Sequence, residues 1–195
     1  MDNNDIWVQK NDREERLGMQ PVVRPQDLAH WTGMKMTRYR LPEEIVDRHI
    51  LAPHPIVTWL CRGQTASRLR YGLGEVHTLC TRDDLMFYGG GREIAYAHWR
   101  TSEAEMVSVE LDPARLSLIE AGDTRLTQRP LHGTPQFNDP ALKNLVAALW
   151  AEVQAGCPLG QLYADSLSLG LAVHVHRRFG ALHNSRGEHR RAQQH

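Results

Sequence analysis

Residues 105–114 read EMVSVELDPA and mark the point where the pattern of the chain changes. The first seven of these residues alternate, so that Val107, Val109 and Leu111 lie on one face of a predicted strand. The sequence Asp112-Pro113-Ala114 is typical of a helix start, because Asp caps free amide groups and Pro suits the first helical position. A strand-rich part of the chain therefore precedes residue 112, and helices follow it.

The part of the chain before this point consists of short β-favouring runs separated by Gly, Pro or charged residues. No long helical pattern separates the early runs, which favours antiparallel pairing in a sandwich or barrel over parallel βαβ units. The predicted strands cover residues 34–41, 56–61, 66–71, 75–80, 85–88, 93–99 and 105–111, with a further one at 124–129.

Three helices are predicted after residue 111. A short one runs from residue 112 to about 122, and a second begins at a repeated Asp-Pro-Ala at 139–141 and ends near 156. Its apolar residues recur every three or four positions and must be buried against another element. A third helix over 159–179 is apolar on more than one side. It needs two partners, which are the sheet and either the second helix or a second subunit.

Length and composition place these elements in one domain. The chain has 195 residues, of which 41% are hydrophobic and 24% charged, as in an ordinary soluble globular domain. We predict an irregular N-terminal arm at 1–30, a barrel at 31–130, a helical segment of the same domain at 131–180 and a disordered tail at 181–195. The fold class is α+β, a mainly antiparallel β-barrel or jelly roll followed by two C-terminal helices.

The charge balance limits the classes of partner. Lys plus Arg and Asp plus Glu both number 23, whereas a DNA-binding domain normally carries a basic surplus, so no direct DNA binding by this chain is predicted. No apolar run is long enough to cross a membrane, and the N-terminus is polar, which favours a cytoplasmic protein. Cys61, Cys80 and Cys157 form no CxxC pair and are interpreted as reduced thiols.

Several groups of polar residues invite a chemical interpretation. His49 and His54 stand five residues apart across a proline, a poor spacing for metal ligands on one strand, so we interpret them as strand-end or pocket histidines. The run Gly89-Gly90-Gly91-Arg92 could hold an anion, but it opens no helix and favours a tight turn with positive φ. Adjacent acids and Cys61 within an apolar strand give no sign of catalysis, and no catalytic residue is predicted.

Aromatic residues in two predicted strands could line a ligand pocket, although they would equally form an ordinary core. The candidate ligand-binding residues are His54, Trp59, Tyr96 and His98. Alternation places Trp99 on the face opposite Tyr96 and His98, so these residues cannot all line one pocket. We expect Trp59 to report a bound ligand, because its strand is apolar enough to run through the barrel core.

Five segments resemble the N-terminal cupin-like sensor and dimerisation domain of AraC-type transcriptional regulators, over residues 33–180. They are RYRLP at 38–42, LDPARL at 111–116, DPAL at 139–142, LYADSL at 162–167 and HRRF at 176–179. The resemblance implies a small organic effector in the barrel and subunits paired through the helices. The partner would be a second copy of this chain or a full-length regulator. The implied dimerisation residues are Leu142, Leu145, Leu149, Leu162, Leu169 and Val173.

Two departures from this family refine the prediction. The polar stretch after Gly180 supplies no helix-turn-helix, so the DNA-reading half of such regulators is expected to be missing from this chain. In the segment DDLMFYGGGREI at 83–94, Ile94 stands about where a cupin metal-binding histidine would be, and isoleucine cannot ligate. We therefore predict a sensor without metal or other cofactor. The alternative is a metal-dependent cupin enzyme.

Overall fold

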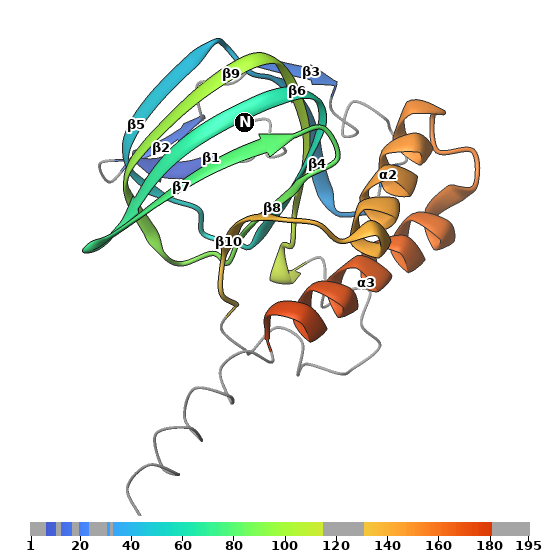
Figure 1. Cartoon of the computed structure of the whole chain (residues 1–195). Helices are drawn as coiled ribbons and strands as arrows, with labels where there is room; N and C mark the ends of the chain where they lie inside the picture. The colour runs from blue at the N-terminus through green and yellow to red at the C-terminus, as the bar shows by residue number, and fades with distance from the viewer. Residues whose placement is uncertain are drawn as a thin grey trace, which may run out of the picture.

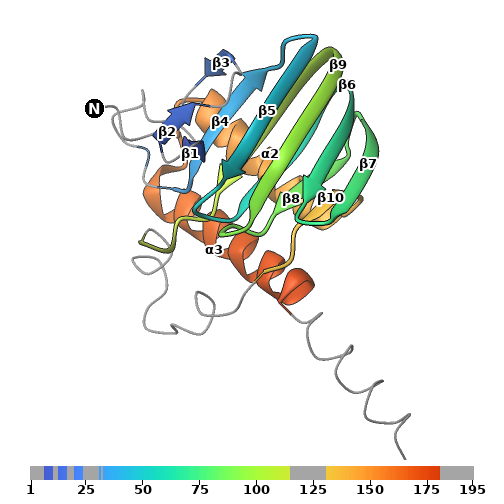
Figure 2. The ribbon, with the colours of Figure 1, turned by 90° about the vertical axis from the view of Figure 1, so that its left-hand side faces the viewer.

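A barrel of antiparallel strands with two helices packed on one side makes up the described part of the molecule (Figures 1 and 2). The computed structural model describes residues 7–10, 13–16, 20–23, 31, 33–114 and 131–180. The strands are β1 (Trp7–Lys10), β2 (Arg13–Arg16), β3 (Gln20–Val23), β4 (Lys35–Arg40), β5 (Glu44–Leu51), β6 (Ile56–Tyr71), β7 (Gly74–Thr81), β8 (Leu85–Tyr88), β9 (Glu93–Glu110) and β10 (Thr134–Phe137). The helices are α2 (Pro140–Gln154) and α3 (Gly160–Phe179). This architecture confirms the predicted fold class.

The long strands β6 and β9 pair with each other and form a seam between two half-sheets. The first part of β6 also pairs with β8 and the second part with β7. In the same way, β9 pairs with β5 through residues 93–100 and with β4 through residues 105–110. One half-sheet thus contains β4, β8 and β10, and the other contains β5 and β7.

A bulge lies where the seam passes from one half-sheet to the other, and it explains an error in the sequence analysis. The register of β6 against β9 shifts near Gly63, which has a φ of +73°, and Glu103 opposite has a φ of +46°. The sequence analysis divided each long strand in two at this point, with strands at 56–61 and 66–71 for β6 and at 93–99 and 105–111 for β9, because glycine and charged residues usually interrupt strands. Here they form a bulge inside a continuous strand, which bends without ending.

The half-sheet containing β4 is buried on both faces. Val107 and Val109 pack toward α2 and α3, whereas Met106 and Ser108 on the same strand face the barrel interior. This confirms the alternation predicted for residues 105–111. It also creates two apolar cores, one between sheet and helices and one inside the barrel.

Helix α2 begins at the predicted Asp-Pro-Ala, and Asp139 also holds α3. One carboxylate oxygen of Asp139 accepts the amide of Leu142 at 3.0 Å. The other accepts His174 Nε2 at 2.9 Å and Arg178 Nη1 at 2.8 Å, both from the last turns of α3. Farther along, the Phe179 ring stacks on Phe87 of β8 with centroids 4.3 Å apart. The start of one helix and the end of the other are therefore fixed at a single buried side chain.

Other sequence predictions need correction or lie outside the described residues. The supposedly irregular segment 1–30 contains β1, β2 and β3, which add to the sheet through β5 and β4. Strand β5 was missed because the left-handed backbone of His49, with a φ of +54°, interrupts its alternation. The strand predicted at 124–129, most of the helix predicted at 112–122 and the tail at 181–195 are not described.

Candidate ligand-binding site

The barrel encloses an apolar cavity of about 60 Å³, here called the inner cavity. Its wall includes Ile50, Met86, Ile94, Trp99 and Met106, which come from the three strands β5, β8 and β9. No charged side chain of the described residues lines it, and its exposed wall is almost entirely apolar. Such a cavity accepts an apolar group and rejects a charged one, because nothing inside replaces the lost water.

The hydroxyls of the barrel interior are buried in the wall. Thr58 Oγ1 and Ser108 Oγ lie 3.0 Å apart across the seam and satisfy each other. The hydroxyl of Thr65, a residue only 1% exposed that also lines the inner cavity, has no hydrogen-bond partner among the described residues. A buried hydroxyl without a partner costs free energy, so this position has not been optimised for stability alone.

A second pocket of about 220 Å³, here called the outer pocket, adjoins the inner cavity. The two share the wall residues Ala52, Tyr88 and Ile94. Burial, the largest influence, raises the pKa of Tyr88 far above its usual range, so this phenol at the junction stays neutral. Because the two spaces share these wall residues, one ligand could extend from the inner cavity into the outer pocket.

The wall of the outer pocket is mixed, with both apolar and polar side chains, and Arg92 supplies positive charge to it. The Arg92 guanidinium lies 4.9 Å from the centre of the Tyr71 ring. Burial raises the pKa of the Tyr71 hydroxyl, and the charge of Arg92 opposes that rise. The glycine run predicted to be a tight turn holds Arg92 in place, with Gly90 and Gly91 at φ of +76° and +64°. Gly91 donates its amide to Ala52 O at 2.9 Å.

The ligand-binding residues predicted from the sequence do not line the inner cavity. Trp59 packs against the core between sheet and helices, and its Nε1 donates to Asp83 Oδ1 at 3.3 Å. Its strand is apolar because that half-sheet is covered on both faces, so strand composition did not show which face is inside. His54 is also outside the cavity, with Nε2 3.8 Å from Glu110 Oε1. Trp99 provides the tryptophan of the cavity wall instead.

Tyr96 and His98 lie on the outer face of the barrel. Three guanidinium groups, those of Arg48, Arg68 and Arg70, lie between 5.8 and 5.9 Å from the Tyr96 ring centre. His98 Nε2 bonds Glu44 Oε1 at 2.7 Å. The alternation argument correctly separated these two residues from Trp99, but the interior face is the one that carries Trp99.

The residues of the inner cavity do not fit a cupin metal ion. Ile94 occupies the wall, as expected from its place in the sequence, and offers no ligand. No group of three or more His, Cys, Asp or Glu side chains suited to a metal occurs within the ranges the structure describes. Five of the described histidines instead each pair with one carboxylate at separate places, for example His49 with Glu93 and His77 with Glu75.

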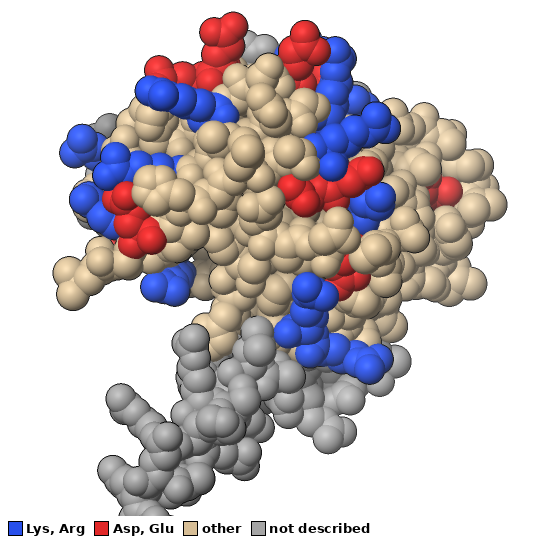
Figure 3. Space-filling view, in the orientation of Figure 1, with Lys and Arg blue, Asp and Glu red and all other residues tan. Residues whose placement is uncertain are grey.

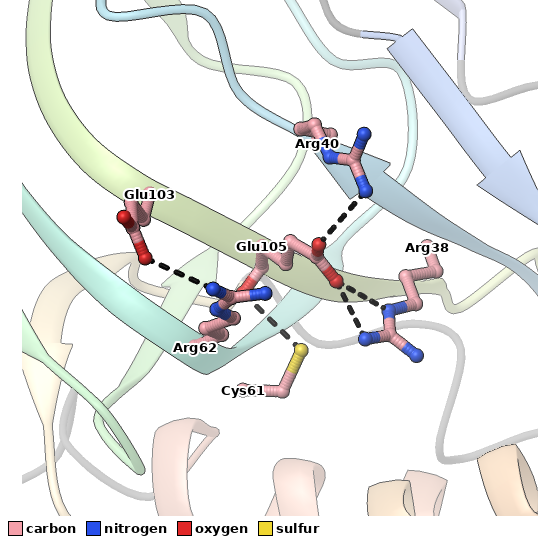
Figure 4. Close-up of polar contacts among 6 residues, drawn as sticks. All are labelled: Arg38, Arg40, Cys61, Arg62, Glu103 and Glu105. Atoms are coloured by element: carbon pink, nitrogen blue, oxygen red, sulfur yellow. Dashed lines mark hydrogen bonds and ion pairs between the residues drawn. The ribbon is translucent and has the colours of Figure 1, made fainter.

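A polar cluster lies outside the barrel where β4, β6 and β9 meet (Figure 4). Figure 4 shows Arg38 and Arg40 of β4 turned toward Glu105 of β9, with Cys61 of β6 beside them. Burial alone would raise the pKa of Glu105, but the hydrogen bonds and charges of both arginines lower it below its ordinary value. Burial raises the pKa of the Cys61 thiol, which donates to Glu105 O at 3.2 Å. The carboxylate is paired and the thiol protonated, so this cluster joins strands and lacks an activated nucleophile.

The residues predicted to pair subunits divide into two groups. Leu142 and Leu149 are completely buried within one chain, so they are unavailable to a partner, and this part of the prediction is wrong. Their stripe does need burial, as predicted, but the chain's own sheet and α3 provide it. Leu145, Leu169 and Val173 are half-buried, and Leu162 is 82% exposed. Neither helix is both long and apolar enough to span a bilayer.

A barrel closed by antiparallel strands, with an apolar interior and two C-terminal helices on one side, is a cupin-like fold. Among solved structures, ToxT from Vibrio cholerae O395, bound to (E)-4-(8-methylnaphthalen-1-yl)but-3-enoic acid, is similar with a TM-score of 0.53. The match has 11% sequence identity and covers 76% of this chain and 58% of the ToxT chain. At this identity the likeness supports the fold alone.

Two further similar structures have lower TM-scores. The CENP-C cupin domain of Drosophila melanogaster matches with 11% identity and a TM-score of 0.31, over 38% of this chain and 59% of that one. Oxalate decarboxylase from Bacillus subtilis matches with 14% identity and a TM-score of 0.33, over 45% of this chain and 23% of that one. This chain thus spans less than two thirds of each of these structures. No protein-family model and no functionally curated protein matches the sequence.

Proposed function

We propose that this chain is the sensor and dimerisation module of an AraC-type transcriptional regulator, with a small organic effector in the barrel. The observation that carries this proposal is the closed barrel with an apolar cavity free of metal-ligand clusters in the described residues. The segments at 162–167 and 176–179 supply the resemblance in sequence, and the AraC-family protein ToxT supplies the likeness in fold. The chain would act in the cytoplasm.

Binding in the barrel is tested by filling the inner cavity. Ile94→Phe enlarges a side chain in the cavity wall, whereas Val46→Phe changes a residue that is 51% exposed on the outer face. Phenol, cyclohexanol and octanol are the probes, because each carries an apolar group into the cavity. We expect at least one probe to raise the melting temperature of the unmutated chain and of Val46→Phe, but not of Ile94→Phe. Equal shifts in all three proteins, or in none, would refute binding in the barrel.

Pairing of subunits through α2 and α3 is the second part of the proposal. Leu162 is exposed at the start of α3 and lies on the same helix as the half-buried Leu169 and Val173. Leu162→Glu leaves the core intact and should convert a dimer to a monomer in light scattering at tens of micromolar. Leu73→Glu, at the fully exposed turn after β6, is the matched control and should remain dimeric. A monomeric unmutated chain would refute this part.

The metal-dependent cupin enzyme is the competing function, and no observation favours it. We propose that the chain is not an enzyme, and metal analysis of protein purified without an affinity tag tests this. Stoichiometric zinc, iron or manganese that survives dialysis against a chelator and is lost in His49→Ala or His54→Ala would establish the enzyme instead.

A further inference from the structure

We infer that the effector is an apolar monocarboxylic acid, with its hydrocarbon part in the inner cavity and its carboxylate on Arg92 in the outer pocket. This inference rests on the proposed function and specifies its ligand. It follows from the contrast between the two adjoining spaces, of which one is small and almost entirely apolar and the other is larger and has charged side chains in a mixed wall.

The size of the inner cavity requires a ligand that extends beyond it. At about 60 Å³ it is smaller than the engineered cavity of about 150 Å³ that holds a benzene molecule in another protein. A larger apolar group must continue past Tyr88 and Ile94 into the outer pocket of about 220 Å³. Because the exposed wall of the inner cavity is almost entirely apolar, any polar group of the ligand belongs in the outer pocket.

The charge of the outer pocket selects an anionic head group. Arg92 is exposed and has no carboxylate partner within the described part of the chain, while its guanidinium is positioned over the Tyr71 ring. Glu75 also lines this pocket, but Arg68 already neutralises its carboxylate through two contacts of 2.9 and 3.0 Å. Arg92 is therefore the cation available to a ligand.

The single available guanidinium of Arg92 favours a ligand with a single negative charge. A guanidinium forms two parallel hydrogen bonds with a carboxylate, which matches its planar shape. A phosphate monoester carries close to two negative charges, of which the single guanidinium of Arg92 would balance only one. A monocarboxylate thus fits the pocket better than a phosphate or a neutral alcohol.

The test compares ligands of one chain length that differ only in the head group. Octanoic acid, octanol and methyl octanoate are titrated at neutral pH and low salt, with calorimetry as the readout. We expect the unmutated chain to bind octanoate at least tenfold more tightly than octanol or the ester. The preference should shrink as salt is added, because Arg92 is exposed to solvent.

Arg92→Gln is the decisive variant, and Arg70→Gln is its matched control. Arg70 is also an exposed arginine over a tyrosine ring, 5.8 Å from Tyr96, but it lies outside the barrel. We expect Arg92→Gln to weaken octanoate binding about tenfold or more and to leave octanol unchanged, while Arg70→Gln changes neither. A circular dichroism melt confirms that both variants are folded.

Each alternative outcome has a distinct meaning. If octanoate and octanol bind equally and Arg92→Gln has no effect, the charge inference is refuted while the barrel remains a binding site. If octanoate does not bind at all, the inference is refuted, and the neutral probes with Ile94→Phe decide the proposed function separately. If octanoate binds Ile94→Phe as well as the unmutated chain, the carboxylate site is not connected to the barrel, and the inference is also refuted.

Discussion

Replacing Asp139 with alanine removes a buried side chain that joins the start of α2 to the end of α3. The lost helix cap, the hydrogen bond to Leu142 N, is worth about 1 kcal/mol. The partners His174 and Arg178 are 33% and 41% exposed, so water solvates them once the carboxylate is gone. Their two ion pairs therefore contribute only about 0.5–1 kcal/mol each. We expect Asp139→Ala to lower the free energy of unfolding by about 2–3 kcal/mol.

Asp139→Asn separates the two contributions. Asparagine caps a helix about as well as aspartate but carries no charge, so we expect a loss of only about 1–2 kcal/mol, the contribution of the two ion pairs. Asp112→Ala is the control, because Asp112 begins the twin Asp-Pro-Ala and accepts the amide of Ala114 at 2.9 Å. Asp112 has a single described ion pair, a 3.7 Å contact with Lys35, so its loss should be about 1 kcal/mol.

Urea unfolding followed by circular dichroism measures these differences, and pH gives an independent check. Burial by itself raises the pKa of Asp139, but Leu142 N, His174 and Arg178 together lower it below its ordinary value of 3.8. The stabilisation is therefore complete above that value and is lost as the pH falls through the lower pKa of the folded state. The gap between the unmutated chain and Asp139→Asn should close below about pH 4. Equal stability of Asp139→Ala and the unmutated chain at neutral pH would refute the reasoning.

Three further predictions follow from features of the barrel and its surface. Gly63→Ala should lower the free energy of unfolding by about 2–4 kcal/mol, because a Cβ there would lie 2.3 Å from Ser102 O. Gly72→Ala is the control in the same urea assay and should lower it by about 1 kcal/mol, because a Cβ at that position meets no atom within 4 Å. Thr65→Val should stabilise the chain by about 1 kcal/mol, since it removes a buried hydroxyl that has no partner in the described part of the chain, and a loss of stability would contradict this. The chain alone should show no salt-resistant, sequence-dependent mobility shift with DNA, because its formal charge is zero and acidic and basic side chains are intermingled on the face in Figure 3.

The sequence predicted the elements of the fold better than the faces that they bury. Alternation in residues 105–111 correctly separated Val107 and Val109 from Met106 and Ser108, because a strand has a period of two whatever packs on it. It could not show which face is the barrel interior, since this half-sheet has apolar residues on both sides. Trp59 was therefore assigned to the interior, although it faces the helices.

The candidate site was predictable only in part, for a related reason. Ile94 and the glycine turn before Arg92 were identified from their order along the chain. Ile94 lines both the inner cavity and the outer pocket, and the glycine turn lines the outer pocket. The approach of Tyr71 to Arg92 depends on pairing between distant strands and leaves no local pattern. The same holds for the stripe of α2, because periodicity shows that Leu142 and Leu149 are buried but not which surface covers them.

The seam between the half-sheets has a consequence for the way the chain folds. The hairpin of β6 and β7 closes through the two residues between Tyr71 and Gly74, so its ends meet at little loop-closure cost. The β6–β9 pairing instead joins Ile56 to Glu110, across the whole of β7 and β8. Each half-sheet takes its central strands from that one long-range pairing, so neither is complete without it. We therefore expect barrel closure to be a late, cooperative step, slower than in a protein of the same length built from local contacts.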